Sequence, residues 1–194
     1  YFISLILFTL ALSIHISAAL YLVLLLMLAL KPQKKGILCL TLATLIISEY
    51  VSVSLLLNVL PFDFIHQKLT AYSNANEFNY SIPLLDLVTI RNLFLVSVSL
   101  LLWERLSKVD HFHIVFYFFF AATLFRVGTK NFAIVAGRGY GAVSMYDCLL
   151  IPMILFLLFG KFWGYFLVSI YALCTLYLNL NINHGWSGES FIQS

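Results

Sequence analysis

Long apolar runs separated by short charged turns are the feature that most limits how this chain can fold. The first run extends from Phe2 to Leu30 and stops at the sequence Lys31-Pro32-Gln33-Lys34-Lys35. An apolar stretch of about 18 residues is long enough to cross a bilayer as a helix. Only 10% of the residues are charged, against about 25% in a soluble domain, and the mean hydropathy is +1.00. The pattern predicts an all-α polytopic membrane protein.

The same pattern predicts about six transmembrane helices in a single domain. Basic residues gather in cytoplasmic loops, so the lysine-rich turn after Leu30 is assigned to the cytoplasm. The polar segment of residues 63–81 then becomes an external loop, and a tight turn is expected at Gly160-Lys161. Because the chain begins at Tyr1, we expect it to be the C-terminal portion of a longer protein. The expected spans are residues 2–30, 37–61, 83–103, 112–126, 142–159 and 162–180.

Three cations, Arg126, Lys130 and Arg138, occupy a glycine-rich break that this topology places on the outer side. Short external loops normally avoid Lys and Arg, so cations there suggest an anionic ligand, for which a lipid-linked pyrophosphate is the best candidate. The glycines predict a broken or re-entrant element lining a cavity, where the backbone approaches a ligand closely. The guanidinium of Arg138 presents a fork that matches phosphate oxygens. The alternative is anchoring to lipid headgroups.

Further polar residues are candidates for the same site. Asp86 and Arg91 lie five residues apart on one expected helix, and their spacing predicts an ion pair, either structural or part of the site. Asp147 is a partner for an arginine or a base for an acceptor hydroxyl. In the external loop, Lys68 and Tyr72 share a helix face, where they either contact phosphate and a sugar ring or act as interfacial anchors.

Several function classes have no support in the sequence. There is no HExxH motif, no P-loop and no pair of closely spaced cysteines, so we expect no metal and no other cofactor. No segment has the composition of a soluble domain that would bind nucleic acid. Glu49, alone within an expected span, is either hydrogen-bonded inside the bundle or part of a polar path.

One pattern begins at Phe125-Arg126, continues over twelve residues to Arg138 and ends in a span that contains Leu149-Leu150-Ile151-Pro152. This pattern resembles the EpsG-like polysaccharide polymerases. These proteins are relatives of the Wzy-type O-antigen polymerases of bacteria. The external segment Lys68-Leu69-Thr70-Ala71-Tyr72 is also similar to that family, and the resemblance covers roughly residues 63–180. It implies a multi-pass protein of the bacterial inner membrane.

The resemblance implies a glycosyltransferase that joins undecaprenyl-pyrophosphate-linked oligosaccharide repeat units on the outer face of the membrane, without a metal. Its implied partners are this lipid-linked substrate, membrane lipid and a chain-length regulator protein. The catalytic roles fall on Arg126, Arg138 and Asp147, with Asp86 as the alternative base. Two alternatives stay open, a flippase for a lipid-linked sugar and a non-catalytic membrane subunit. The residues implied to bind substrate are Lys68, Tyr72, Asp86, Arg91, Lys130 and Tyr140.

Overall fold

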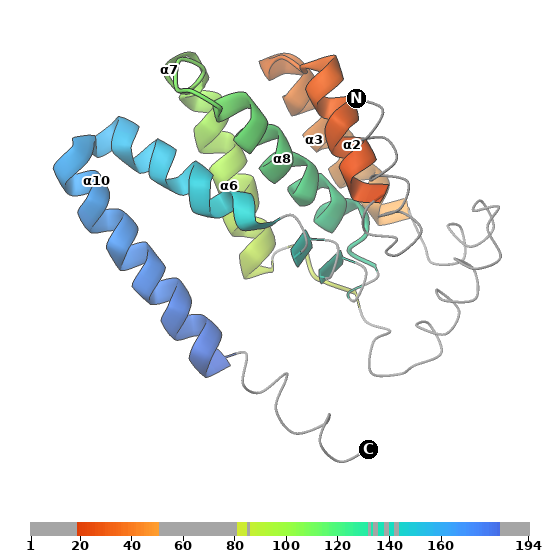
Figure 1. The fold of residues 1–194 in the computed structure, drawn as a ribbon. Helices are drawn as coiled ribbons and strands as arrows, with labels where there is room; N and C mark the ends of the chain where they lie inside the picture. The colour runs from red at the N-terminus through yellow and green to blue at the C-terminus, as the bar shows by residue number, and fades with distance from the viewer. Residues whose placement is uncertain are drawn as a thin grey trace, which may run out of the picture. The chain divides into compact units, whose positions relative to one another are not determined.

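The computed structural model describes residues 19–50, 81–84, 86–131, 133, 136–137, 140–141 and 144–182, and within them all regular secondary structure is helical. The ribbon in Figure 1 labels the longer elements. In chain order the elements are α2 (Ala19–Leu30), α3 (Lys34–Tyr50), α6 (Leu87–Leu101), α7 (Trp103–Leu106), α8 (Phe112–Gly128), the 3-10 helix η2 (Ser144–Tyr146) and α10 (Asp147–Ile182).

Charged turns separate the helices where the sequence predicted them. Between α2 and α3, Lys31 takes a left-handed conformation with φ of 44° and is followed by Pro32, which cannot donate a backbone hydrogen bond. Between α7 and α8, His111 is left-handed as well, with φ of 63°. Lys31 directly follows the end of α2, and His111 is the N-cap at which α8 begins.

Helix α8 is the centre of the unit formed by residues 1–147, and it packs against α2, α3 and α6. In Figure 1 it lies between α6 and the α2–α3 pair. Its sequence is apolar around its whole circumference, which is the pattern of a helix buried on all sides. The small residues Ala121 and Ala122 pack around Tyr140, which brings the glycine-rich segment against α8. The fully buried aromatic side chains of α8 are Phe112, Phe116, Phe119 and Phe120.

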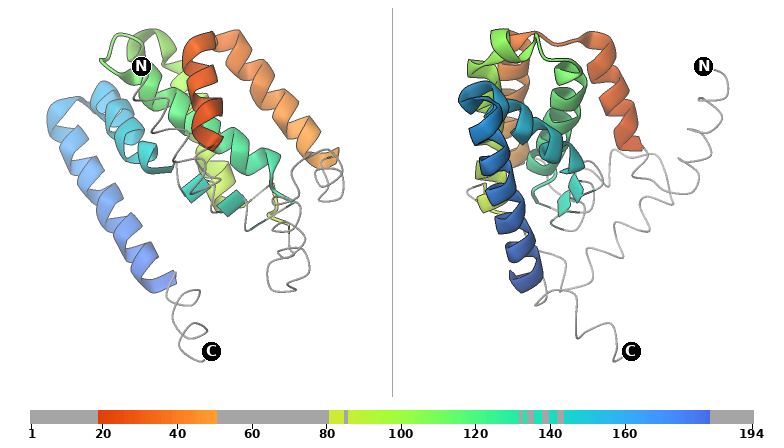
Figure 2. Two further views of the ribbon diagram at one scale, coloured as in Figure 1. Left: turned by 45° about the vertical axis from the view of Figure 1, so that its right-hand side comes forward. Right: turned by 60° about the vertical axis from the view of Figure 1, so that its left-hand side comes forward.

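The unit has two distinct ends, because α6 and α8 run antiparallel and α3 runs parallel to α8. The α2–α3 turn lies near the start of α8, where the Tyr117 hydroxyl donates to the Pro32 carbonyl over 3.2 Å. At the opposite end, the beginning of α6 meets the end of α8 through Asp86 and Arg126. Both views in Figure 2 show the α2–α3 turn and the α7 loop at the same end of the unit. The lysine-rich turn and the predicted ligand site are therefore at opposite ends.

The second unit, residues 148–194, contains nearly all of α10. This helix is broken at Gly160, which has φ of 71° and ψ of −178°, a conformation that only glycine adopts readily. The break coincides with the turn predicted at Gly160-Lys161. The ring of Phe156, before the break, is in edge contact with the ring of Tyr165, after it, at 4.9 Å between centroids.

The described surface is strongly apolar. Within the described residues, one helix, Asp147–Tyr177, is long and apolar enough to cross a membrane, judged by length and composition. Helices α6 and α8 are shorter apolar helices. Large apolar side chains are exposed along α3, at Leu38, Leu42, Ile46 and Ile47. A helical protein with a membrane-type surface agrees with the sequence, and the number of spans stays a prediction.

Candidate functional site

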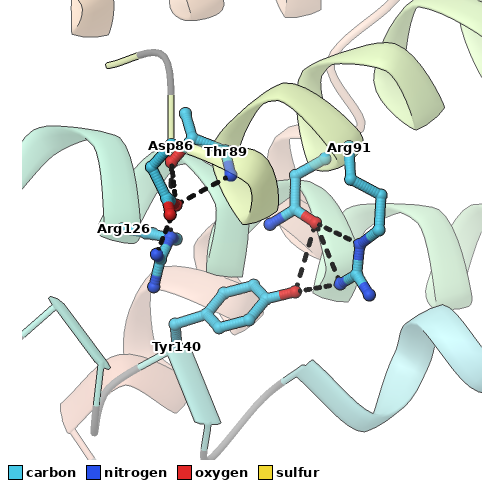
Figure 3. A network of polar contacts seen from close by, with 6 residues as sticks. Asp86, Thr89, Arg91, Arg126 and Tyr140 are labelled. Atoms are coloured by element: carbon cyan, nitrogen blue, oxygen red, sulfur yellow. Dashed lines mark hydrogen bonds and ion pairs between the residues drawn. The ribbon is translucent and has the colours of Figure 1, made fainter. Parts of the chain in front are cut away.

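The first part of the candidate site forms where α6 begins. Asp86 is the N-cap of α6, and its Oδ2 accepts from the backbone N–H of Thr89 at 3.2 Å and from the Thr89 hydroxyl at 3.3 Å. Aspartate is a preferred residue at this position because it satisfies donors that have no partner within the helix. The same Oδ2 accepts from Nη2 of Arg126, and the two atoms are 2.6 Å apart. Figure 3 draws this contact as a dashed line. The cap of α6 thereby fixes the arginine at the end of α8.

Arg126 is held on three sides. Its Nε donates to the Thr89 hydroxyl at 3.3 Å, and its guanidinium carbon lies 5.4 Å from the centre of the Tyr140 ring. The residue is only 9% exposed. These contacts use Nε and Nη2 and leave Nη1 without a hydrogen bond to the described residues. Arg126 is therefore preorganised, with one edge of its fork available to a further acceptor.

A second cluster forms one turn further along α6. Nη2 of Arg91 donates to Oδ2 of Asp147 at 2.9 Å and to the Tyr140 hydroxyl at 2.8 Å. The Tyr140 hydroxyl donates to Oδ1 of Asn92 at 3.2 Å, and this oxygen also accepts from Nε and Nη2 of Arg91. Burial raises the pKa of the Tyr140 hydroxyl, so the hydroxyl stays protonated at neutral pH and donates its hydrogen bond to Asn92.

Tyr140 joins the two clusters. Its ring faces Arg126 and its hydroxyl contacts Arg91, and Figure 3 shows the side chain lying between the two arginines. It comes from the glycine-rich segment, whereas the arginines come from α8 and α6. Residues far apart in the sequence thus converge on a single buried ring.

Lys130 forms a third ion pair, beyond the end of α8. Its Nζ donates to Oε1 of Glu49 near the end of α3, and the neighbouring Asn131 donates from Nδ2 to the Ser48 carbonyl at 3.1 Å. The backbone carbonyl of Lys130 accepts from the N–H of Ile82 at 2.8 Å. These contacts tie the start of the glycine-rich segment to α3 and to the residues that precede α6. Glu49 is therefore hydrogen-bonded, as one of its two alternatives had it, although its side chain is 55% exposed.

The structure corrects one predicted pairing. Asp86 and Arg91 do not pair with each other, because Asp86 sits at the cap of α6 and faces Arg126, while Arg91 points to Asp147. A separation of five residues turns the second side chain away from the first on an α-helix. Both residues still belong to one polar region. Asp147 pairs with an arginine, which was one of the two roles that the sequence predicted for it. Lys68, Tyr72 and Arg138 lie outside the described residues.

Sequence reasoning missed Asn92 and Thr89. Both are buried on the face of α6 that meets α8, and Asn92 has no exposed surface. Their signal in the sequence was a pair of polar residues three apart beside Asp86 and Arg91. A buried amide in an apolar helix is costly unless it is hydrogen-bonded, so an uncharged polar residue in such a helix indicates a polar site as a charged one does.

The electrostatic balance of the site is close to neutral. Each of the three described cations of this region, Arg91, Arg126 and Lys130, is paired with a carboxylate. The paired carboxylates lower the cost of burying the cations, and they also compete with an anionic ligand for them.

Fold and site together define a helical protein with a membrane-type surface, in which a buried arginine and a half-buried one converge on a tyrosine at one end of the helices. The EpsG family model matches residues 1–192, so the chain belongs to the EpsG family. This family is associated with exopolysaccharide biosynthesis. Searches of curated proteins and of solved structures gave no match.

Proposed function

We propose that the protein polymerises lipid-linked oligosaccharide repeat units, with the Arg126–Tyr140–Arg91 cluster binding the pyrophosphate of the carrier lipid. The observation that carries the proposal is the convergence of two arginines on one buried tyrosine, at the end of the helices opposite the lysine-rich turn. Membership of the EpsG family supports the same pathway. Arg138, Lys68 and Tyr72 complete the site in this proposal.

The reaction is a glycosyl transfer. The bond between the anomeric carbon of the growing glycan and the pyrophosphate oxygen breaks, and its electron pair leaves with undecaprenyl pyrophosphate. A hydroxyl of the incoming repeat unit forms the new bond to that carbon and loses its proton to a base. Negative charge grows on the leaving group, and fixed guanidinium donors in a site of low dielectric stabilise it.

Arg126 suits the role of hydrogen-bond donor to the leaving pyrophosphate, because its hydrogen bonds to Asp86 and Thr89 already orient it. A side chain fixed before the reaction has little reorganisation left to undergo as charge develops. Asp147 suits the role of base better than Asp86 does. Oδ2 of Asp86 accepts from the N–H and the hydroxyl of Thr89 and from Arg126, whereas within the described residues the carboxylate of Asp147 accepts only from Arg91.

The test is a gel of surface glycan from cells that carry Arg126→Ala or Arg138→Ala in the full-length gene, with protein abundance measured. Arg105→Ala, an exposed arginine on α7 at the other end of the unit, is the matched control. The proposal predicts glycan that stops at one repeat unit for the site variants and a normal ladder for the control. Unchanged ladders for both site variants would mean that these arginines contact lipid headgroups and are not needed for polymerisation. Complete loss of surface glycan would favour a flippase.

A further inference from the structure

We infer that Asn92 is a binding and positioning residue of the same site. Its side-chain oxygen holds Arg91 and Tyr140 in place, and its amide N–H donates to an oxygen of the bound pyrophosphate. The inference rests on the proposed function, because the ligand is the one named there. It adds a residue to the site that carries no charge.

The oxygen of Asn92 is fully engaged. It accepts from Nε of Arg91 at 3.3 Å, from Nη2 of Arg91 at 3.2 Å and from the Tyr140 hydroxyl at 3.2 Å. Only an oxygen accepts from three donors, so the orientation of the amide follows from its neighbours. Asn92 therefore fixes the hydroxyl of the ring that supports Arg126 and one edge of the Arg91 guanidinium.

The nitrogen of Asn92 is in the opposite situation. Nδ2 is buried and has no hydrogen-bond partner, a state that it shares, within the described residues, with the hydroxyl of Ser99. Buried donors in native proteins nearly always have a partner, so an orphaned one needs an explanation. In this inference the bound pyrophosphate supplies the missing acceptor. Ser99 lies two turns further along α6, and none of the cluster's hydrogen bonds involves it.

A neutral donor has an advantage at this site. Arg91, Arg126 and Lys130 each face a carboxylate that competes with an anionic ligand. The amide N–H of Asn92 faces no such competitor, so the ligand oxygen gains its hydrogen bond without displacing an ion pair. This donor offsets part of the weakening that the paired carboxylates impose on the arginines.

The experiment measures binding of undecaprenyl pyrophosphate to the purified full-length protein in detergent, with a melting curve for every variant. Asn92→Leu removes both the acceptor and the donor. Asn92→Asp keeps an acceptor for Arg91 and Tyr140 but removes the donor and adds a negative charge. We expect both variants to bind about tenfold more weakly or worse, the loss typical of one hydrogen bond to a charged group.

Ser99→Ala is the matched control, because it removes a buried polar group from the same face of α6. We expect its affinity to equal that of the wild type. Weak binding by both variants, each with a melting temperature close to that of the wild type, supports the inference, because Asn92→Leu loses the donor without adding a charge that repels the ligand. Should Asn92→Leu fail to fold, Asn92→Ala takes its place.

Two outcomes overturn the inference in distinguishable ways. Wild-type affinity in Asn92→Asp would mean that Asn92 serves only as a structural acceptor, and the proposed function would stand if Arg126→Ala still weakened binding. Absence of binding to the wild-type protein would overturn the proposed function and the inference together.

Discussion

Replacement of Asp86 separates two contributions that one carboxylate makes to the fold. Asp86→Asn keeps an oxygen that caps α6 but removes the charge that faces Arg126. Asp86→Ala removes both the cap and the ion pair. Because asparagine and aspartate are equally good N-cap residues, the difference between the variants isolates the cap.

The size of each effect follows from burial. The Arg126 side chain is 11% exposed, so the loss of its partner leaves a buried charge uncompensated. Such a loss costs about 3–5 kcal/mol when both partners are buried, and the 26% exposure of the Asp86 side chain places the expected cost near the lower end, at about 3 kcal/mol. The cap contributes about 1 kcal/mol more. We therefore expect about 3 kcal/mol for Asp86→Asn and about 4 kcal/mol for Asp86→Ala.

The assay is reversible unfolding of the purified protein in mixed micelles, which gives the free energy of unfolding for each variant. Asp110→Asn, an exposed aspartate in the turn before α8, is the control for a change of charge alone, and we expect no measurable effect. Wild-type stability in Asp86→Asn would refute the reasoning, because it would mean that Arg126 is not held by this carboxylate.

Three further perturbations test other contacts. Glu49→Gln breaks the pair with Lys130. Because the Glu49 side chain is 55% exposed, we expect the free energy of unfolding to fall by less than about 1 kcal/mol in the same assay. A fall as large as that of Asp86→Asn would contradict this expectation. Gly160→Ala places a side chain in a positive-φ conformation with open space around it, so backbone strain alone should lower the free energy of unfolding by about 1–3 kcal/mol. An unchanged melting temperature would mean that the backbone at this position is not in the positive-φ conformation. Gly164→Ala brings a Cβ within 2.2 Å of the Phe156 ring, so we expect about 1–3 kcal/mol of destabilisation in the unfolding assay, relieved by Phe156→Leu.

The sequence was sufficient for the features that depend on local pattern. The lysine-rich turn after Leu30, the charged turn near His111 and the break at Gly160 follow from proline, glycine and charge in apolar surroundings. The helices near residues 83–103 and 112–126 were expected within a few residues of α6 and α8. Each of these features is set by residues close together in the chain.

The partners of the charged residues depend on tertiary packing and were not predictable in the same way. Arg126 meets Asp86 across 40 positions and Arg91 meets Asp147 across 56. No spacing rule reaches such distances, and the local rule that linked Asp86 to Arg91 chose the wrong partner. Asn92 was missed for a related reason, because an uncharged amide stands out only when its buried neighbours are known.

Glycan growth by purified protein is the most direct test of the central claim, that the arginine–tyrosine cluster serves polymerisation. The full-length protein, reconstituted in lipid vesicles, receives undecaprenyl-pyrophosphate-linked repeat units isolated from the same cells. Wild-type protein should lengthen the glycan and release one undecaprenyl pyrophosphate for each bond formed, and Arg126→Ala should do neither while Arg105→Ala behaves like the wild type. Equal glycan growth with Arg126→Ala, or none with the wild type, would contradict the account.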